Sequence, residues 1–374
     1  MKAEEFVHVL QSEFYTGVPD SLLQPLCNYL MKHYGVDKKH HVIGANEGNC
    51  VAMAAGYHLA TGKYPVVYMQ NSGEGNAVNP IASLLNEKVY AIPAIFVVGW
   101  RGEPGKKDEP QHIFQGEITR SLLSLLSIES YVVGKETTVT ELTRVRASFE
   151  EQLSKGQSVA FVIQKGALTN DEEMVYSNAY HMTREAVVRA VSEVAKEDPI
   201  VSTTGKASRE LFEAREARGG GHQYDFLTVG SMGHASSIAC AIAAQKPETK
   251  IWCVDGDGAL IMHMGAMAVV GRLQPDNLVH ILINNEAHET VGGLPTAADA
   301  VSLSEIAKAC GYQVIPKVEE EAELLEALKK CRDSRKLTFL EVDCALGARA
   351  DLGRPTTSAR ENKEQFMQYL KQRL

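Results

Sequence analysis

The stretch KIWCVDGDGALIMHMGAMAVVGRLQPDNLVHILINN, residues 250–285, decides the fold. It contains an apolar, β-prone run at Lys250–Asp255, a segment rich in Ala and Met at Ala259–Arg272, and a second apolar run at Leu278–Ile283. This order predicts a strand–helix–strand crossover that places both strands in one parallel sheet. The carboxyl ends of the two strands then meet at one edge, which is where ligands bind in open α/β sheets.

An Asp and an Asn stand where these predicted strands end. Asp257 is the centre of Gly256-Asp257-Gly258, and Asn285 closes the second strand. A carboxylate and an amide carbonyl are hard oxygen donors that suit a Mg²⁺ ion which also holds phosphate oxygens. The two glycines allow the backbone to approach a diphosphate closely. Gly-Asp-Gly is also common turn chemistry, so the Asn after the next strand is what makes the pattern informative.

Length and composition restrict the class of protein. The 374 residues are enough for two domains, and 44% hydrophobic with 23% charged residues is ordinary for a globular protein. A formal net charge of −9 argues against nucleic acid or an anionic membrane as the main partner. We find no apolar run of membrane-spanning length and no signal peptide pattern. The seven cysteines are scattered without a Cys-x-x-Cys pair, which favours reduced thiols and a cytoplasmic location.

The two halves of the chain repeat one order of elements. In the first half, a small-residue helix at Glu47–Thr61 precedes a strand at Tyr64–Gln70, a Gly-rich turn, a helix at Ala77–Leu85 and a strand at Ile92–Gly99. The second half has the same order, beginning with a helix at Gly233–Ala244. We therefore predict an α/β fold of two doubly wound parallel-sheet domains, residues 1–168 and 183–374, joined by a linker at 169–182. The alternative is one long doubly wound domain.

Five stretches make the chain resemble thiamine diphosphate-dependent decarboxylases, and among them the phosphonopyruvate decarboxylase family, with sulfopyruvate decarboxylase as a near neighbour. These stretches are TGVPDSLL (16–23), QNSGEGNAVNP (70–80), GWRGEPGKKDEPQH (99–112), GSMGHASSIA (230–239) and NNEAHETVGGLPT (284–296). The resemblance implies a pyrimidine-binding first domain, a diphosphate-binding second domain and no middle domain. Larger 2-oxo acid decarboxylases often carry a catalytic His pair, whereas His112 stands alone after Pro110.

The same resemblance implies roles for cofactor-binding residues. Glu47 would contact the pyrimidine ring of thiamine diphosphate, although a Glu in a first helical turn is also a common dipole partner. Met232 would wedge beneath the cofactor, although a lone Met is usually core filler. The full expected cofactor set is Glu47, Gly230, Ser231, Met232, Gly256, Asp257, Gly258, Ala259 and Asn285. The expected Mg²⁺ ligands are Asp257, Asn285 and the backbone carbonyl of Ala287.

Substrate-binding residues are expected mainly from the loop at 99–112. Arg101, Lys106 and Lys107 form a local basic cluster that can bind an anion, yet Asp108 and Glu109 partly offset it, so a solvated surface loop remains the alternative. His112 and His288 are further expected substrate contacts. Asp20 is an expected acid–base residue, although its position also fits a helix N-cap before Ser21–Leu30.

The implied reaction is decarboxylation of 3-phosphonopyruvate, a small 2-oxo acid, within phosphonate biosynthesis. The resemblance also implies a homodimer or higher homo-oligomer, in which Glu47 and Asp257 of different chains serve one cofactor. Decarboxylation of sulfopyruvate is the nearest alternative. A carboligase and a non-catalytic cofactor-binding subunit are more distant ones, and retention of Glu47 with the full metal set argues against the last.

Overall fold

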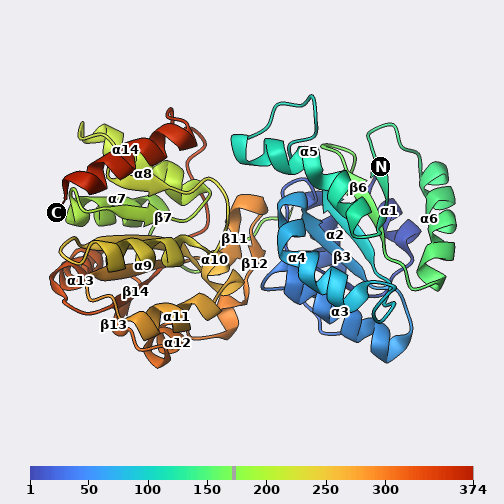
Figure 1. Ribbon diagram of the computed structural model, residues 1–374, viewed down its shortest axis with the longest axis horizontal. Coiled ribbons are helices and arrows are strands. Elements are labelled where there is room, and N and C mark those ends of the chain that lie inside the picture. The colour runs from blue at the N-terminus through green and yellow to red at the C-terminus, as the bar shows by residue number, and fades with distance from the viewer. Residues whose placement is uncertain (171–173, 374) are drawn as a thin grey trace. The chain divides into compact units, whose positions relative to one another are not determined.

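The computed structural model of the protein describes residues 1–170 and 174–373. The chain divides into two compact units, Met1–Val175 and Tyr176–Leu374. Each unit contains a six-stranded parallel sheet with helices packed against it (Figure 1). The predicted α/β fold class with two parallel sheets is therefore confirmed.

The first unit is built on strands that all pair in parallel, in the order β2-β1-β3-β4-β6-β5. The strands are β1 (Tyr15–Gly17), β2 (His41–Ile43), β3 (Val66–Gln70), β4 (Ile95–Gly99), β5 (Glu129–Val133) and β6 (Val159–Ile163). The helices are α1 (Ala3–Leu10), α2 (Gln24–Tyr34), α3 (Glu47–Thr61), α4 (Glu74–Pro80), α5 (Pro110–Leu125) and α6 (Val139–Ser154). A 3₁₀ turn (Asn71–Gly73) precedes α4, and a π-helical turn (Ile81–Leu85) follows it.

The second unit has a parallel sheet in the order β13-β14-β10-β9-β7-β8, with a separate two-stranded hairpin of β11 and β12. The sheet strands are β7 (Ile200–Ser202), β8 (Asp225–Leu227), β9 (Ile251–Gly256), β10 (Leu278–Asn284), β13 (Gln313–Val318) and β14 (Thr338–Asp343); the hairpin strands are β11 (Ala287–His288) and β12 (Leu294–Pro295). The helices are α7 (Arg184–Ala195), α8 (Lys206–Ala217), α9 (Ala235–Gln245), α10 (Asp257–Met262), α11 (Gly265–Leu273), α12 (Leu303–Ala309), α13 (Glu321–Asp333) and α14 (Ala359–Gln372). Short 3₁₀ turns lie at Glu289–Val291 and Ala297–Ala300.

The predicted duplication is confirmed at the level of topology. If the main-sheet strands of each unit are numbered in chain order, both sheets have the order 2-1-3-4-6-5. In this comparison β3 of the first unit corresponds to β9 of the second, and β4 corresponds to β10. The turn after β3, which leads into α4, is therefore the counterpart of the Gly256-Asp257-Gly258 turn after β9.

Several predicted helices have different limits in the structure. The expected helix at Ala259–Arg272 is two helices, α10 and α11, because the backbone leaves helical geometry at His263 (φ −131°, ψ 42°). The helix expected from Gly233 starts at Ala235, since Gly233 has a positive φ of 86°. The helix expected at Ala77–Leu85 ends as an α-helix at Pro80, where the π-helical turn begins.

Side chains on β9 alternate between two buried clusters, which explains why this strand is apolar throughout. Trp252 and Val254 pack in the cluster that α7, α8 and α13 complete, whereas Cys253 packs in the cluster that α9, α11 and α12 complete. Helices thus cover both faces of this sheet, as a doubly wound fold requires. Among the described residues, none of the helices combines the length and apolar character that a bilayer crossing requires.

The absence of a side chain at Gly271 allows α11 to pack closely against the backbone at Cys310. A Cβ atom at this position would lie 1.7 Å from the Cys310 carbonyl oxygen, so backbone would have to move. We expect Gly271→Ala to lower the free energy of unfolding by about 1–3 kcal/mol. The measurement is urea unfolding followed by circular dichroism.

Gly265→Ala is the matched control, because Gly265 begins the same helix and a Cβ there meets no atom within 4 Å. This variant should be as stable as the wild type or more stable by up to about 1 kcal/mol. Equal unfolding midpoints for the two variants would show that the close approach at Gly271 has no energetic consequence.

Candidate functional site

The Asp and Asn singled out in the sequence lie next to each other at one sheet edge. β9 and β10 are paired neighbours, with Gly256 opposite Ile283, so Asp257 and Asn285 continue from adjacent strand ends. Both side chains are buried, with exposed fractions of 3% and 6%. The predicted crossover and the predicted placement of the two residues at the carboxyl edge are confirmed.

Asp257 is a buried carboxylate with few partners. Its Oδ2 atom accepts a hydrogen bond of 2.5 Å from the Thr296 hydroxyl. Burial raises the pKa of Asp257 to about 7, and the hydrogen bonds from Thr296 and from the backbone of Gly258 only partly oppose this shift. Among the described residues no ion pair with this carboxylate is formed, and a bound cation would stabilise its ionised form.

The Asn285 amide is oriented by a charged neighbour. Its Nδ2 donates to Glu289 Oε2 at 2.9 Å, and its Oδ1 accepts from the Ala287 backbone N–H at 3.2 Å. Glu289 also forms ion pairs with Arg184 and with Lys206 (2.8 Å). These cations hold the Glu289 carboxylate in place, which directs the amide oxygen of Asn285 away from Glu289.

The expected third metal ligand lies in the short hairpin that follows. Glu286 has a positive φ of 58°, and this turn leads from β10 into β11. The Thr296 N–H donates to the Glu286 carbonyl oxygen at 2.9 Å, so the next pair, Ala287 with Pro295, is a non-hydrogen-bonded pair of the hairpin. The Ala287 carbonyl oxygen therefore points away from β12.

Gly258 and His288 are in close contact. A Cβ atom on Gly258 would lie 3.2 Å from the imidazole of His288 and from the Thr296 methyl group. Burial lowers the pKa of His288 to about 4, so its imidazole is neutral at neutral pH. His288 thus lies beside Asp257, as a neutral and largely enclosed side chain.

The turn that contains Met232 packs against α10. Ser231 and Gly233 have positive φ values of 55° and 86°. A Cβ atom on Gly233 would lie 2.8 Å from the Ala259 carbonyl oxygen. The turn formed by Gly230, Ser231 and Met232 therefore lies beside the helix that Asp257 begins, with Met232 half-buried.

In the first unit, Glu47 is enclosed at the start of α3. Asn46 caps this helix by accepting from the Asn49 N–H at 2.9 Å, and Glu47 is 5% exposed. Glu47 Oε2 accepts a hydrogen bond of 2.7 Å from Asn76 Nδ2. A Cβ atom on Gly73 would lie 2.2 Å from Glu47 Oε1, so any side chain at this position must displace the carboxylate.

Glu74, which follows Gly73, is a second buried acid in this turn. Its Oε1 atom makes no hydrogen bond with any described residue, and burial raises its pKa to about 8. The sequence showed Glu74 and Asn76 in the turn that corresponds to Gly256-Asp257-Gly258, but gave neither a role. The hydrogen bond from Asn76 to Glu47 could not be predicted from the sequence, because the two residues are far apart in the chain.

Asp20 lies at the carboxyl edge of the first sheet. Its carboxylate accepts hydrogen bonds from Gln70 Nε2 (2.6 Å), at the end of β3, and from the Leu22 N–H (3.0 Å). It also packs against Gly99, at the end of β4. Burial raises the pKa of Asp20 despite these bonds. The expectation that Asp20 could cap a helix at Ser21–Leu30 was wrong, because α2 begins at Gln24 after Leu23.

The loop that carries the expected cations contains an internal ion pair. Both Arg101 Nε (2.8 Å) and Nη2 donate to the Asp108 carboxylate, and Nη1 donates to the Ser21 hydroxyl at 3.2 Å. Lys106 and Lys107 are exposed. Arg101 is thus held in place with its charge largely compensated. From the sequence, the proximity of Asp108 and Glu109 indicated only that the basic cluster is partly offset.

His112 lies near the start of α5 and is half-buried. Burial is the main cause that lowers the pKa of His112, and the positive charge of Arg101 lowers it further. The imidazole is therefore neutral at neutral pH. Gly102 has a positive φ of 67°, and a Cβ atom there would lie 1.9 Å from the His112 carbonyl oxygen. The loop and the start of α5 are therefore closely packed.

Comparison with known proteins assigns the class. The family model described as the thiamine pyrophosphate enzyme N-terminal TPP binding domain matches residues 3–123, and the C-terminal TPP binding domain of the same enzymes matches residues 203–342. Thiamine pyrophosphate is the same compound as thiamine diphosphate. With its two α/β units, the chain is therefore a thiamine diphosphate enzyme.

Curated relatives refine this class. The chain is 32% identical to phosphonopyruvate decarboxylase of Streptomyces viridochromogenes, over 95% of this chain and 90% of the relative. It is also 32% identical to phosphonopyruvate decarboxylase of Streptomyces hygroscopicus (94% and 89% covered), and 28% identical to sulfopyruvate decarboxylase of Methanosarcina acetivorans (79% of each). The chain belongs to the phosphonopyruvate decarboxylase family and is a thiamine diphosphate-dependent decarboxylase.

The residues present fit this cofactor. In the second unit, the Asp257 carboxylate is buried without an ion pair to any described residue, and the oxygens of Asn285 and Ala287 lie at the same sheet edge. Such oxygen donors suit a metal ion that binds a diphosphate. In the first unit, Glu47 is a buried carboxylate that can meet a polar ring atom. The individual roles of these residues remain predictions.

Gly73→Ala should separate the position of Glu47 from general stability. The new methyl group must displace the Glu47 carboxylate, and a displacement of this size can reduce the rate of decarboxylation by about 100-fold. The measurement is kcat/KM for CO₂ release, with circular dichroism to confirm folding.

Gly75→Ala is the control, since Gly75 lies in α4, is exposed, and a Cβ there meets no atom within 4 Å. This variant should keep wild-type turnover. A folded Gly73→Ala protein with wild-type kcat/KM would show that the close contact with Glu47 is irrelevant to catalysis.

Proposed function

We propose that this chain catalyses the thiamine diphosphate- and Mg²⁺-dependent, non-oxidative decarboxylation of 3-phosphonopyruvate to phosphonoacetaldehyde and CO₂. The observation that carries the proposal is the similarity to two phosphonopyruvate decarboxylases, which covers about nine-tenths of this chain and of each relative. The product is an aldehyde that retains the carbon–phosphorus bond, which fits a step in the biosynthesis of 2-aminoethylphosphonate or related phosphonates.

Asp257, Asn285 and the Ala287 carbonyl are the proposed Mg²⁺ ligands. The buried Asp257 carboxylate supplies the negative charge, and the Asn285 oxygen is directed by the hydrogen bond from its amide nitrogen to Glu289. The turn at Gly256–Gly258 and Ala259 would lie against the diphosphate. Met232, half-buried in the turn after β8, would support the cofactor from below, with Gly230 and Ser231 beside it.

Glu47 is the proposed catalytic carboxylate. Asn76 fixes one of its oxygens, and the other faces the space that Gly73 leaves free. Glu47 would hold a proton shared with the pyrimidine ring. Thiamine diphosphate, when bound, supplies the electron sink that accepts the electron pair released as CO₂ leaves. Asp20, whose pKa is raised by burial, can carry a proton closer to neutral pH than an exposed Asp and is the proposed acid–base residue.

The loop at 99–112 is the proposed anchor for the phosphonate group. Asp108 compensates the charge of Arg101 and orients its guanidinium group. The guanidinium N–H groups that do not bind Asp108 or Ser21 can donate to a further acceptor. Lys106 and Lys107 are exposed and supply the uncompensated charge. His112 and His288 would contact the substrate as neutral imidazoles, which can donate or accept hydrogen bonds without adding charge.

The proposed assembly is a homodimer or a multiple of it. In this arrangement Glu47 of one chain and Asp257 of another serve the same cofactor, and an isolated chain has no complete site. The proposal rests on the resemblance to thiamine diphosphate enzymes and on the separation of the expected residues into two units.

Sulfopyruvate decarboxylation is the second candidate function. It is favoured by the 28% identity to the relative from Methanosarcina acetivorans over 79% of this chain. A phosphonate carries up to two negative charges and a sulfonate one, so a site with more uncompensated cations favours the phosphonate. The two exposed lysines therefore favour phosphonopyruvate.

Release of CO₂ should be measured with phosphonopyruvate, sulfopyruvate and pyruvate, with thiamine diphosphate and Mg²⁺ each present or omitted. We expect kcat/KM to favour phosphonopyruvate by at least about 100-fold, because the loop must recognise a charged group that pyruvate lacks. Activity should be lost when either cofactor is removed. Preference for sulfopyruvate would show that the second candidate function is the correct one. Absence of CO₂ release from all three substrates would overturn the proposal.

A pair of double variants tests the anchor within the same assay. Lys106→Ala with Lys107→Ala should raise KM for phosphonopyruvate and leave KM for pyruvate unchanged. Lys38→Ala with Lys39→Ala removes another adjacent pair of exposed lysines from the same unit and should change neither value. Equal effects of the two double variants would show that Lys106 and Lys107 do not bind the phosphonate.

A further inference from the structure

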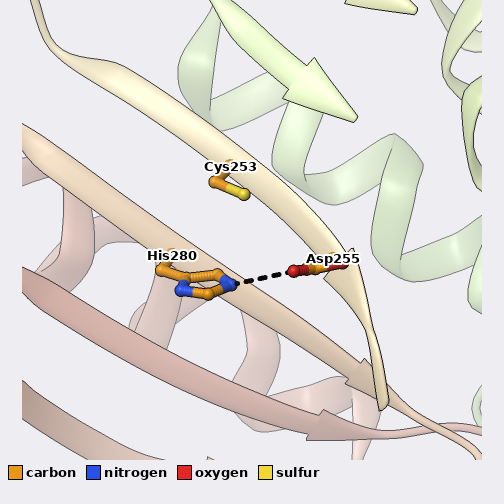
Figure 2. Close-up of side chains that lie close together, drawn as sticks. All are labelled: Cys253, Asp255 and His280. Atoms are coloured by element: carbon orange, nitrogen blue, oxygen red, sulfur yellow. Dashed lines mark ion pairs between the residues drawn. The ribbon is translucent and has the colours of Figure 1, made fainter. Parts of the chain in front are cut away.

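Three side chains with metal-binding atoms face one another inside the second unit, on strands that lead to Asp257 and Asn285 but buried in the sheet rather than at its edge. Cys253 and Asp255 lie two residues apart on β9 and therefore on the same face of the sheet. His280 lies on β10, directly opposite Cys253 in the register. Figure 2 shows the three side chains converging from the two strands. Their exposed fractions are 0%, 1% and 0%.

The cluster is short of hydrogen bonds. Asp255 Oδ2 and both ring nitrogens of His280 form none with the described residues. The one polar contact between these side chains is the Asp255–His280 ion pair, at 3.5 Å from Oδ2 to Nε2 (Figure 2). A buried polar atom that makes no hydrogen bond destabilises the folded protein, and a bound metal ion would supply a partner for these three atoms.

Apolar and aromatic groups surround the cluster. The His280 ring meets Phe339 edge-on, with ring centroids 5.3 Å apart, and Tyr312 at 6.1 Å. The Tyr312 hydroxyl is also buried and makes no hydrogen bond with the described residues. The sheet face around the cluster is otherwise part of the hydrophobic core under α9, α11 and α12.

We propose that Cys253, Asp255 and His280 form a binding site for a divalent transition metal ion of the zinc class. One ligand atom from each residue lies within 4.8 Å of the other two. Ligands bound to zinc at about 2.0–2.2 Å in a tetrahedron are separated by about 3.3 Å, close to the 3.5 Å between Asp255 Oδ2 and His280 Nε2. Small rotations of the side chains would complete the coordination.

The donor set determines the class of metal. A thiolate and an imidazole favour Zn²⁺ and similar borderline ions, whereas Mg²⁺ requires oxygen ligands. The Cys253 site is thus chemically distinct from the oxygen donors proposed at Asp257 and Asn285. Three protein ligands leave a fourth position, which the Tyr312 hydroxyl or a water molecule would fill.

The proposed ion has a structural consequence that does not depend on the substrate. It would join β9 to β10, the two strands whose ends carry Asp257 and Asn285. Binding free energy of a metal that requires the folded site is also folding free energy. The ion would therefore stabilise the sheet edge on which the proposed cofactor-binding residues depend.

Metal content is the first test. The full-length protein is produced in medium supplemented with Zn²⁺, treated with a mild chelator to remove loosely bound ions, and analysed by inductively coupled plasma mass spectrometry. We expect about one zinc ion per chain in the wild type, because the three ligands form one enclosed site. Cys253→Ala should lose most of this zinc. Cys331→Ala, which removes a fully buried thiol from α13, should retain it. Little zinc in the wild type, or equal zinc in Cys253→Ala, would overturn the proposal.

A spectroscopic test uses the wild type and does not depend on the folding of a variant. Protein produced with Co²⁺ in place of Zn²⁺ should show a thiolate-to-cobalt charge-transfer band in the near ultraviolet and the intense visible bands of a four-coordinate ion. Cobalt bound only at the oxygen donors of the cofactor site would give weak six-coordinate bands without charge transfer. That second spectrum would contradict the Cys253 site while leaving the proposed function intact.

Discussion

The parallel pairing of β9 with β10 is the constraint on which the second unit depends. Because the two strands run side by side in register, residues that are nearly thirty positions apart in the chain emerge at one edge, with Gly256 opposite Ile283. Asp257 and Asn285 are consequently neighbours, although no short sequence motif links them. The helices between them only have to return the chain to the same end of the sheet. The hairpin of β11 and β12 then brings Thr296 back to Asp257, which completes the edge.

The first unit uses the same topology for different chemistry. Its strand order repeats that of the second unit, but the residues at its carboxyl edge are acids held by amides: Asp20 by Gln70, and Glu47 by Asn76. Two close approaches at glycine, Gly99 against Asp20 and Gly73 against Glu47, leave room for these carboxylates. One unit therefore has an Asp and an Asn on adjacent strand ends, and the other has two buried carboxyl groups held by amides. The proposed roles divide in the same way, with the diphosphate assigned to the second unit and the pyrimidine ring to the first.

Sequence reasoning predicted the features that depend on local patterns and topology. The limits of α3 were correct because Asn46 caps its start and Gly62, with φ 70°, ends it. The shared edge of Asp257 and Asn285 followed from the crossover alone. The partners that tune the site could not be predicted, because Thr296, Glu289 and Asn76 reach their targets only through the folded chain. The pairing of Arg101 with Asp108 and the break between α10 and α11 depend on side-chain and backbone geometry that periodicity does not encode.

The proposed assembly requires Glu47 and Asp257 to act on one cofactor from different chains. Mixing Glu47→Gln with Asp257→Asn, each expected to be inactive alone, measures this requirement, because a mixed dimer has one site with both residues intact. After unfolding and refolding an equal mixture, we expect about a quarter of wild-type decarboxylation, since half of the dimers are mixed and each has one intact site of two. Absence of activity, when differently tagged chains are shown to co-purify as mixed dimers, would show that Glu47 and Asp257 of different chains do not serve a shared site.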